Sequence, residues 1–162
     1  MTTIISTLRR DGNRVPLQDQ DGISVIKEMT FAGATENDPG DQSGTGNPAD
    51  LFTVTGDVIV KVMAVCDTLL ASGGAATLEI GVSGDTAVFI AQTTATDIDA
   101  NEIWHDASPD NSIELESVAG ERIVTNGQDI IQTVGTTDIS SGAITYYCLW
   151  RQLSANANVV AA

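Results

Sequence analysis

The stretch from Asp97 to Asp110 holds the residue types in this chain that could do chemistry. It reads DIDANEIWHDASPD and contains the only histidine, His105, and one of the two tryptophans, Trp104. Carboxylates and amide oxygens bind calcium, imidazoles bind zinc, and both carboxylates and imidazoles act as general acids and bases. The stretch is therefore either a metal or catalytic site, or the acidic rim of something built from other residues.

Calcium is the metal that the spacing fits best. Asp97, Asp99 and Asn101 match the first three oxygen ligands of an EF-hand-like loop. The glycine that should come next is replaced by Glu102, and the twelfth position, which needs a bidentate glutamate, is Ser108. We assign no metal ligand here, although a calcium site of another geometry stays open as an alternative.

The other chemical motifs are also incomplete. His105, Cys66 and Cys148 are spaced in no zinc-binding pattern. The sequence GVSGD at 81–85 is not the G-x-S-x-G elbow of acyl-transfer enzymes, and GTGNPA at 44–49 follows a polar loop where a phosphate-binding loop would follow a strand. We therefore predict that the protein is not an enzyme, with no catalytic residue and no cofactor. His105 beside Trp104 is interpreted as an amphipathic pair at the edge of the core.

The elements that position these residues are predicted to be strands. Alternation with a period of two and β-branched runs recur along the chain, whereas no window combines helical periodicity with helix caps. The predicted strands lie at 22–31, 56–70, 76–82, 87–93, 112–118, within 121–134, and at 143–153. Short strands at this spacing, with turn residues between them, are typical of an all-β, antiparallel β-sandwich or jelly roll.

The strand at 56–70 is apolar on both of its faces. One face carries Val58, Val60, Val62, Ala64 and Cys66, and the other carries Ile59, Lys61, Met63, Val65 and Asp67. This pattern predicts a central strand of the sandwich. Further along, Asn126-Gly127 separates two β-rich runs and is the strongest short hairpin signal, because a type I′ turn needs positive φ at both central residues. Cys66 and Cys148 fall within strands and are predicted to be buried free thiols, since nothing else indicates an oxidising compartment.

Three regions flank or interrupt the predicted sandwich domain, which spans 22–155. Residues 1–21 contain turn residues and no sustained pattern, so we predict an extended N-terminal arm. Residues 33–50 are rich in glycine and proline and predict a long loop, either flexible or ordered only against a neighbouring subunit. Residues 156–162 are predicted to form a C-terminal tail.

The charge is strongly acidic and unevenly distributed. The chain has 7 basic and 22 acidic residues, a net charge of −15. Residues 1–28 carry four of each, so the whole acidic excess falls on residues 29–162. Such a body lacks the basic stripe that nucleic acids or anionic membranes require, so neither is expected as a partner. The charge serves either solubility alone or the recognition of a basic partner surface.

Three stretches resemble small structural proteins of tailed bacteriophages. They read LFTVTGDVIVKVMAVCDTLL, FIAQTTATDIDANEIWHDASPD and YYCLWRQLSANANVV, and the resemblance covers about residues 51–160. It implies a β-rich virion protein, made in the host bacterial cytoplasm and assembled without secretion, which agrees with the lack of a recognisable signal peptide. Some of these proteins are capsid decoration (cement) proteins, which are often trimeric and reach onto the shell with an N-terminal arm.

The resemblance therefore implies a capsid decoration protein whose partners are the major capsid protein and further copies of itself, a trimer being favoured. Arg9, Arg10 and Arg14 of the arm are the candidate partner-binding residues. A tail, tail-tip or head-fibre subunit is the first alternative. A carbohydrate- or calcium-binding β-sandwich module is the second.

Overall fold

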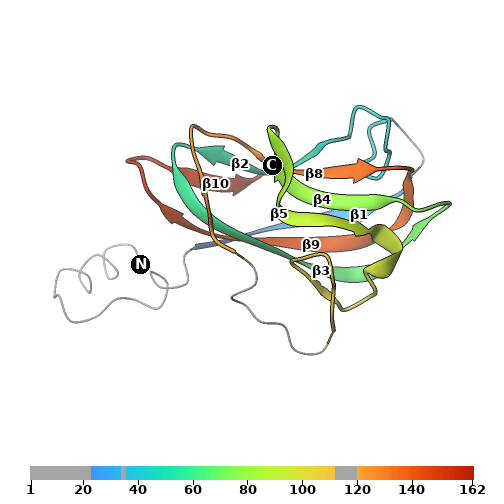
Figure 1. The fold of residues 1–162 in the computed structure, drawn as a ribbon. Coiled ribbons are helices and arrows are strands. Elements are labelled where there is room, and N and C mark those ends of the chain that lie inside the picture. Colours follow the sequence, from blue (N-terminus) through green and yellow to red (C-terminus); the bar gives the residue numbers. More distant parts are fainter. Residues whose placement is uncertain (1–22, 34–35, 112–119) are drawn as a thin grey trace.

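Two five-stranded antiparallel sheets pack face to face and enclose the core (Figure 1). The computed structural model describes residues 23–33, 36–111 and 120–162. Sheet A contains, in spatial order, β1 (Ile23–Phe31), β9 (Ile139–Gln152) and β3 (Val58–Ser72), whose far edge pairs with β6 (Ile103–Trp104) and β7 (Arg122–Val124). Sheet B contains, in order, β10 (Asn158–Ala161), β2 (Ala49–Thr55), β8 (Ile130–Gly135), β4 (Thr77–Val82) and β5 (Asp85–Thr94). The predicted all-β antiparallel sandwich is confirmed.

The core is built by alternation along the two longest strands, β3 and β9. Val62 lies opposite Cys148 in the register of the sheet, and both side chains face sheet B. Every second residue in either direction is buried as well: Val58, Val60, Ala64 and Cys66 in β3, and Ile144, Tyr146 and Trp150 in β9. The apolar residues that recur at every second position in the sequence therefore all point to the same face of the sheet. Both cysteines are free and buried, as predicted.

One polar contact crosses this core. The Tyr146 hydroxyl, on sheet A, donates a hydrogen bond to Gln132 Oε1, on sheet B, and both residues are fully buried. The amide of Gln132 donates in turn to the carbonyl oxygen of Pro39 at 3.2 Å. A buried polar chain of this kind fixes the register of one sheet against the other, because any other arrangement leaves its members unsatisfied.

The described part of the loop predicted at 33–50 is held by the chain's own sandwich, so the interpretation that only a neighbouring subunit orders it is wrong. Asn47 pairs with Val134 of β8 through both a donated and an accepted hydrogen bond, each of 2.9 Å. The Ile139 N–H donates to the Gly40 carbonyl at 2.8 Å. These side-chain and backbone bonds replace the apolar anchors that the loop sequence lacks. Ala49 and Asp50, placed in the loop by the prediction, already belong to β2.

The hairpin predicted at Asn126-Gly127 is also wrong. Both residues have positive φ, 62° and 66°, as the turn signal requires. However, the strands on either side do not pair, because β7 joins β3 in sheet A whereas β8 lies in sheet B. The turn instead crosses between the sheets, and the Asn126 N–H donates to the Asp57 carboxylate at 3.0 Å. The local signal predicted the backbone conformation but not the pairing.

The end of the chain differs from the predicted tail at 156–162. β10 is an edge strand of sheet B whose Val159 lies opposite Val54 and is buried. Two hydrogen bonds hold its end: the Ala162 N–H donates to the Leu51 carbonyl, and the Lys27 ammonium donates to the Ala162 carbonyl. With four residues and one buried side chain, Val159, this strand is too short for its alternation to be recognised in the sequence alone. The strand predicted at 112–118 lies outside the described residues.

Helix is nearly absent from the described ranges. The helical element there is η1 (Ala95–Asp97), a single 3₁₀ turn of three residues. Across the ranges that the structure describes, no helix has the length and apolar character needed to cross a membrane.

Candidate functional site

The acidic stretch 97–110 is a packed connection between the sheets. Trp104 is fully buried, and its indole N–H donates to Thr93 Oγ1 at 3.0 Å. His105 is only 5 % exposed, with its Nδ1 3.9 Å from the Asp106 carboxylate. Both side chains are buried, and Trp104 belongs to the core itself, where the sequence predicted an amphipathic pair at its edge. Ile98 is buried too, and it anchors the start of the stretch.

Hydrogen bonds donated by backbone N–H groups hold this connection in shape. The Glu102 carboxylate, which stands where an EF-hand needs glycine, accepts the Asp99 N–H at 2.7 Å. The Asn101 N–H donates to the Cys66 carbonyl at 2.7 Å, and the Cys66 N–H donates to the Glu102 carbonyl at 3.0 Å. Over the described part of the chain, no three His, Cys, Asp or Glu side chains gather as metal ligands would.

The two buried thiols are poor nucleophiles. Burial, with Asp67, Glu102 and Asp99 adding to it, raises the pKa of Cys66 from 9.0 to about 11. Burial raises the pKa of Cys148 from 9.0 to about 12. Because the thiolate is the reactive form, the arrangement opposes covalent catalysis by either residue.

We expect neither Cys66 nor Cys148 to react with a thiol reagent at pH 8 while the protein is folded. Raising the pKa from 9.0 to about 11 lowers the thiolate fraction of Cys66 about 100-fold at this pH, and steric shielding adds to that. Colorimetric titration should detect two thiols only after denaturation. A thiol that reacts in the native protein at the rate of a free cysteine would contradict the buried placement.

The same shifts predict that stability is lost at alkaline pH. The unfolded thiols ionise near pH 9.0 and the folded ones near 11 and 12. A group whose folded pKa is the higher one contributes its stability in full below the unfolded pKa and loses it as the pH rises through the folded pKa. The contribution of the thiols to the midpoint of chemical denaturation should therefore be constant up to about pH 9 and fall above it.

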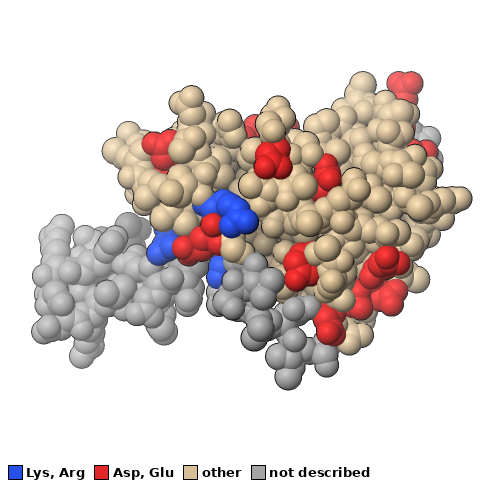
Figure 2. Space-filling model, viewed as in Figure 1, with Lys and Arg blue, Asp and Glu red and all other residues tan. Residues whose placement is uncertain are grey.

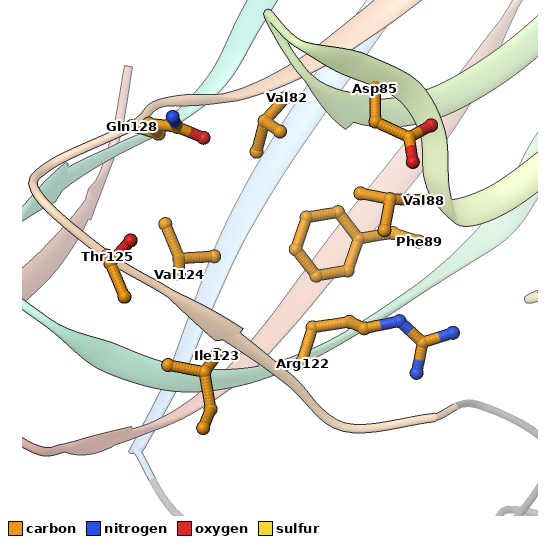
Figure 3. A pocket seen from close by; sticks show the side chains of 9 residues that line it. All are labelled: Val82, Asp85, Val88, Phe89, Arg122, Ile123, Val124, Thr125 and Gln128. Atoms are coloured by element: carbon orange, nitrogen blue, oxygen red, sulfur yellow. The ribbon is translucent and has the colours of Figure 1, made fainter.

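A small pocket opens between β5 and β7, at one side of the sandwich (Figure 3). Its volume is about 130 Å³, well below the 300–1,000 Å³ of sites for drug-sized ligands. Val124 and Phe89 approach each other across it, while Asp85 and Arg122 lie at its margin (Figure 3). The pocket offers an apolar hollow and no set of groups for proton transfer or nucleophilic attack.

The outer face of sheet A is the surface that stands out. Cross-strand partners share a face of a sheet, so the residues that alternate with the core define it. They are Ser24, Ile26, Glu28 and Thr30 of β1, Ala143, Thr145, Tyr147, Leu149 and Arg151 of β9, Ile59, Lys61, Met63, Val65 and Asp67 of β3, Ile123 of β7, and Ile103 of β6. Half of them are large and apolar. Ile26 is 50 % exposed and Ile123 is 65 % exposed, and Figure 3 shows Ile123 on the opposite side of β7 from Val124.

The outer face of sheet B is of the ordinary solvated kind. It carries Asp50, Thr53 and Thr55 of β2, Thr133 and Ile131 of β8, Thr77 and Glu79 of β4, and Asn158 and Val160 of β10. Antiparallel sheets in sandwiches normally alternate apolar-in and polar-out. Sheet B follows this rule and sheet A breaks it. A broad exposed apolar surface marks a site of association.

The charges of the described residues also distinguish the outer face of sheet A from the outer face of sheet B. The Lys and Arg atoms gather in one region on the visible side of the molecule, whereas Asp and Glu are spread over the rest (Figure 2). Two of the described basic residues, Lys61 and Arg151, belong to the outer face of sheet A. On this face the two cations offset the carboxylates of Glu28 and Asp67.

The sequence signal for this surface was the two-sided apolar pattern of 56–70. We interpreted it as a central strand, which is correct, but its second face is only partly buried, because no other layer of the described chain covers it. The predicted partner-binding residues Arg9, Arg10 and Arg14, and the arm at 1–21, lie outside the described residues.

Comparison of the chain with known protein families, curated proteins and solved structures found no match.

Proposed function

We propose that this chain is a structural subunit of a tailed-phage particle, specifically a capsid decoration protein with no catalytic role. The observation that carries the proposal is the contrast between the two outer faces, apolar on sheet A and polar on sheet B. A subunit of a permanent assembly needs one surface that is buried against a neighbour and another that is exposed to solvent. The acidic remainder keeps copies soluble where they are crowded on a shell.

The strand order supports a jelly roll as the form of the sandwich. The chain places β1 in sheet A, β2 in sheet B, β3 in sheet A, and β4 and β5 in sheet B. β8 then inserts between β2 and β4, and β9 inserts between β1 and β3. This is the interleaving expected of two Greek keys, an architecture found in viral capsid and lectin domains. The fold alone does not choose between such roles, so the proposal depends on the apolar face.

In this proposal the arm at 1–21 attaches the subunit to the major capsid protein. Three of the seven basic residues, Arg9, Arg10 and Arg14, lie in this arm, whereas the rest of the chain is strongly acidic. An extended arm can add a strand to a sheet edge of its partner, where backbone hydrogen bonds supply the affinity.

The copy number of the protein in purified particles tests the proposal. Quantitative mass spectrometry should find hundreds of copies, close to the number of major capsid subunits. A few copies per particle would move the protein to the tail, tail tip or head fibre. Its absence from particles would overturn the assignment to the virion.

A further inference from the structure

We propose that a second copy of this chain covers the outer face of sheet A, packing face to face about a two-fold axis that crosses the strands at the level of Tyr147. The inference rests on the proposed function in that both require this face to be covered. It goes further by naming what covers it.

The axis is placed by the row of residues that lies halfway along the face. Ile26, Tyr147 and Met63 are cross-strand neighbours on β1, β9 and β3. This row carries no charge and is mostly apolar, and Ile26 is half exposed. Two such rows in contact would bury aromatic, thioether and branched aliphatic side chains against their own counterparts, which is the composition of an interface core.

The charges of the face are sorted to its two ends. Lys61 and Arg151 lie at one end, where their cross-strand partners are Leu149 and Ile59. Glu28 lies at the other end, opposite Thr145. Asp67 is also at that end, because its carboxylate accepts the Thr145 hydroxyl at 2.6 Å.

The cationic end is partly neutralised within the subunit. Arg151 pairs with Glu121 at 2.6 Å, and both side chains remain substantially exposed. Among the described residues of the face, the cations lie at this end and the carboxylates Glu28 and Asp67 lie at the opposite end. The face as a whole is close to neutral, although the chain carries −15.

A two-fold axis across the strands reverses the order of the rows. The end with Lys61 and Arg151 then lies over the end with Glu28 and Asp67 of the second copy, and the apolar rows meet in the middle. An axis parallel to the strands would instead place like charges over like charges. The sorting of charges therefore selects one of the two face-to-face arrangements, and it makes the face self-complementary, as an isologous interface must be.

The size of the face suits a modest dimer. Four strand positions at about 4.8 Å and nine residues at about 3.4 Å give roughly 590 Å² per copy. Two copies would bury roughly 1,200 Å², at the lower end of the range for specific interfaces. We therefore expect an affinity on the order of micromolar, within reach of direct measurement on the isolated protein.

Sedimentation equilibrium of the full chain tests the proposal. At physiological salt and up to about 100 µM, the protein should approach the mass of a dimer. Met63→Lys, which puts a charge into the middle row, should shift the chain to the monomer. Thr133→Lys makes the same kind of change on the outer face of sheet B and should leave the dimer intact. A wild-type chain that stays monomeric or forms a trimer overturns the two-fold proposal, and so does a Met63→Lys dimer.

A charge exchange tests the orientation. Arg151→Asp and Asp67→Arg should each weaken the dimer about tenfold, because each leaves like charges facing each other. The double variant restores opposite charges across the axis and should bind within about threefold of wild type. Glu79→Lys on sheet B is the control for a reversed charge. Additive weakening in the double variant overturns the orientation. Circular dichroism and the melting temperature establish that each variant is folded.

Failure here is separable from failure of the proposed function. A protein that is monomeric in solution but abundant in particles overturns the dimer and leaves the virion role standing. A protein that forms the dimer in solution but is absent from particles overturns the virion role and leaves the dimer standing.

Discussion

Replacing Trp104 by alanine should lower the free energy of unfolding by about 3–5 kcal/mol, the largest effect that we expect from one side chain. Trp104 is fully buried, lies opposite Ala64 in sheet A, and donates its indole N–H to Thr93. Its removal leaves a cavity and deprives the acidic connection of its main anchor. Denaturant unfolding followed by far-UV circular dichroism measures the change.

The control comes from the same stretch. Asp97→Ala combined with Asp99→Ala should change the free energy of unfolding by less than about 0.5 kcal/mol, as is usual for surface substitutions. The melting temperature of the wild type should be the same in calcium and in EDTA. A drop in EDTA that the double variant abolishes would show instead that the stretch is a calcium site and would revive the carbohydrate- or calcium-binding module.

Breaking the contact between Tyr146 and Gln132 should have the second largest effect. Gln132→Leu leaves the Tyr146 hydroxyl and the Pro39 carbonyl without this partner in the core. A buried polar group that loses its hydrogen bond costs about 1–3 kcal/mol. Tyr146→Phe should cost a similar amount, because it strands Gln132 Oε1. Urea denaturation of each variant gives the values.

The double variant distinguishes this account from simple loss of packing. With both partners replaced by apolar side chains, the free energy of unfolding should recover part of the way towards wild type, since neither the Tyr146 hydroxyl nor Gln132 Oε1 is then stranded and only the Pro39 carbonyl lacks its donor. Strictly additive losses would indicate that the hydrogen bond contributes nothing. In that case volume, and not polarity, would explain both single variants.

The long strands could be predicted from the sequence because their signal is local. β3 and β9 alternate over many residues, so Val62 and Cys148 could be assigned to the core before their pairing was known. β2 and β10 were missed, because a strand of seven or four residues has too few alternations to stand out. Asn126-Gly127 shows the limit most clearly: its φ values follow from the residue types, whereas the sheet that each flanking strand joins depends on contacts far along the chain.

The outer face of sheet A could not be predicted from the sequence, because its composition depends on the register between strands. The sequence showed that Ile59, Met63 and Val65 form a second apolar face of one strand, but not that Tyr147 and Ile26 continue it on neighbouring strands. The separation of Lys61 from Glu28 is likewise a property of the register. Conversely, the acidic stretch 97–110 contains residue types that suit metal binding or catalysis. Its hydrogen bonds instead hold the connection between the two sheets in place.

Hydroxyl-radical footprinting of the protein in purified particles tests most directly whether the outer face of sheet A is covered. Ile123 on this face and Val160 on the outer face of sheet B are both exposed branched aliphatic residues, 65 % and 46 % in the isolated subunit. Exposure in the subunit alone would make Ile123 the more heavily labelled of the two. Coverage in the assembly predicts the opposite order, with Val160 labelled and Ile123 protected. Labelling of Ile123 above Val160 in particles would contradict the account.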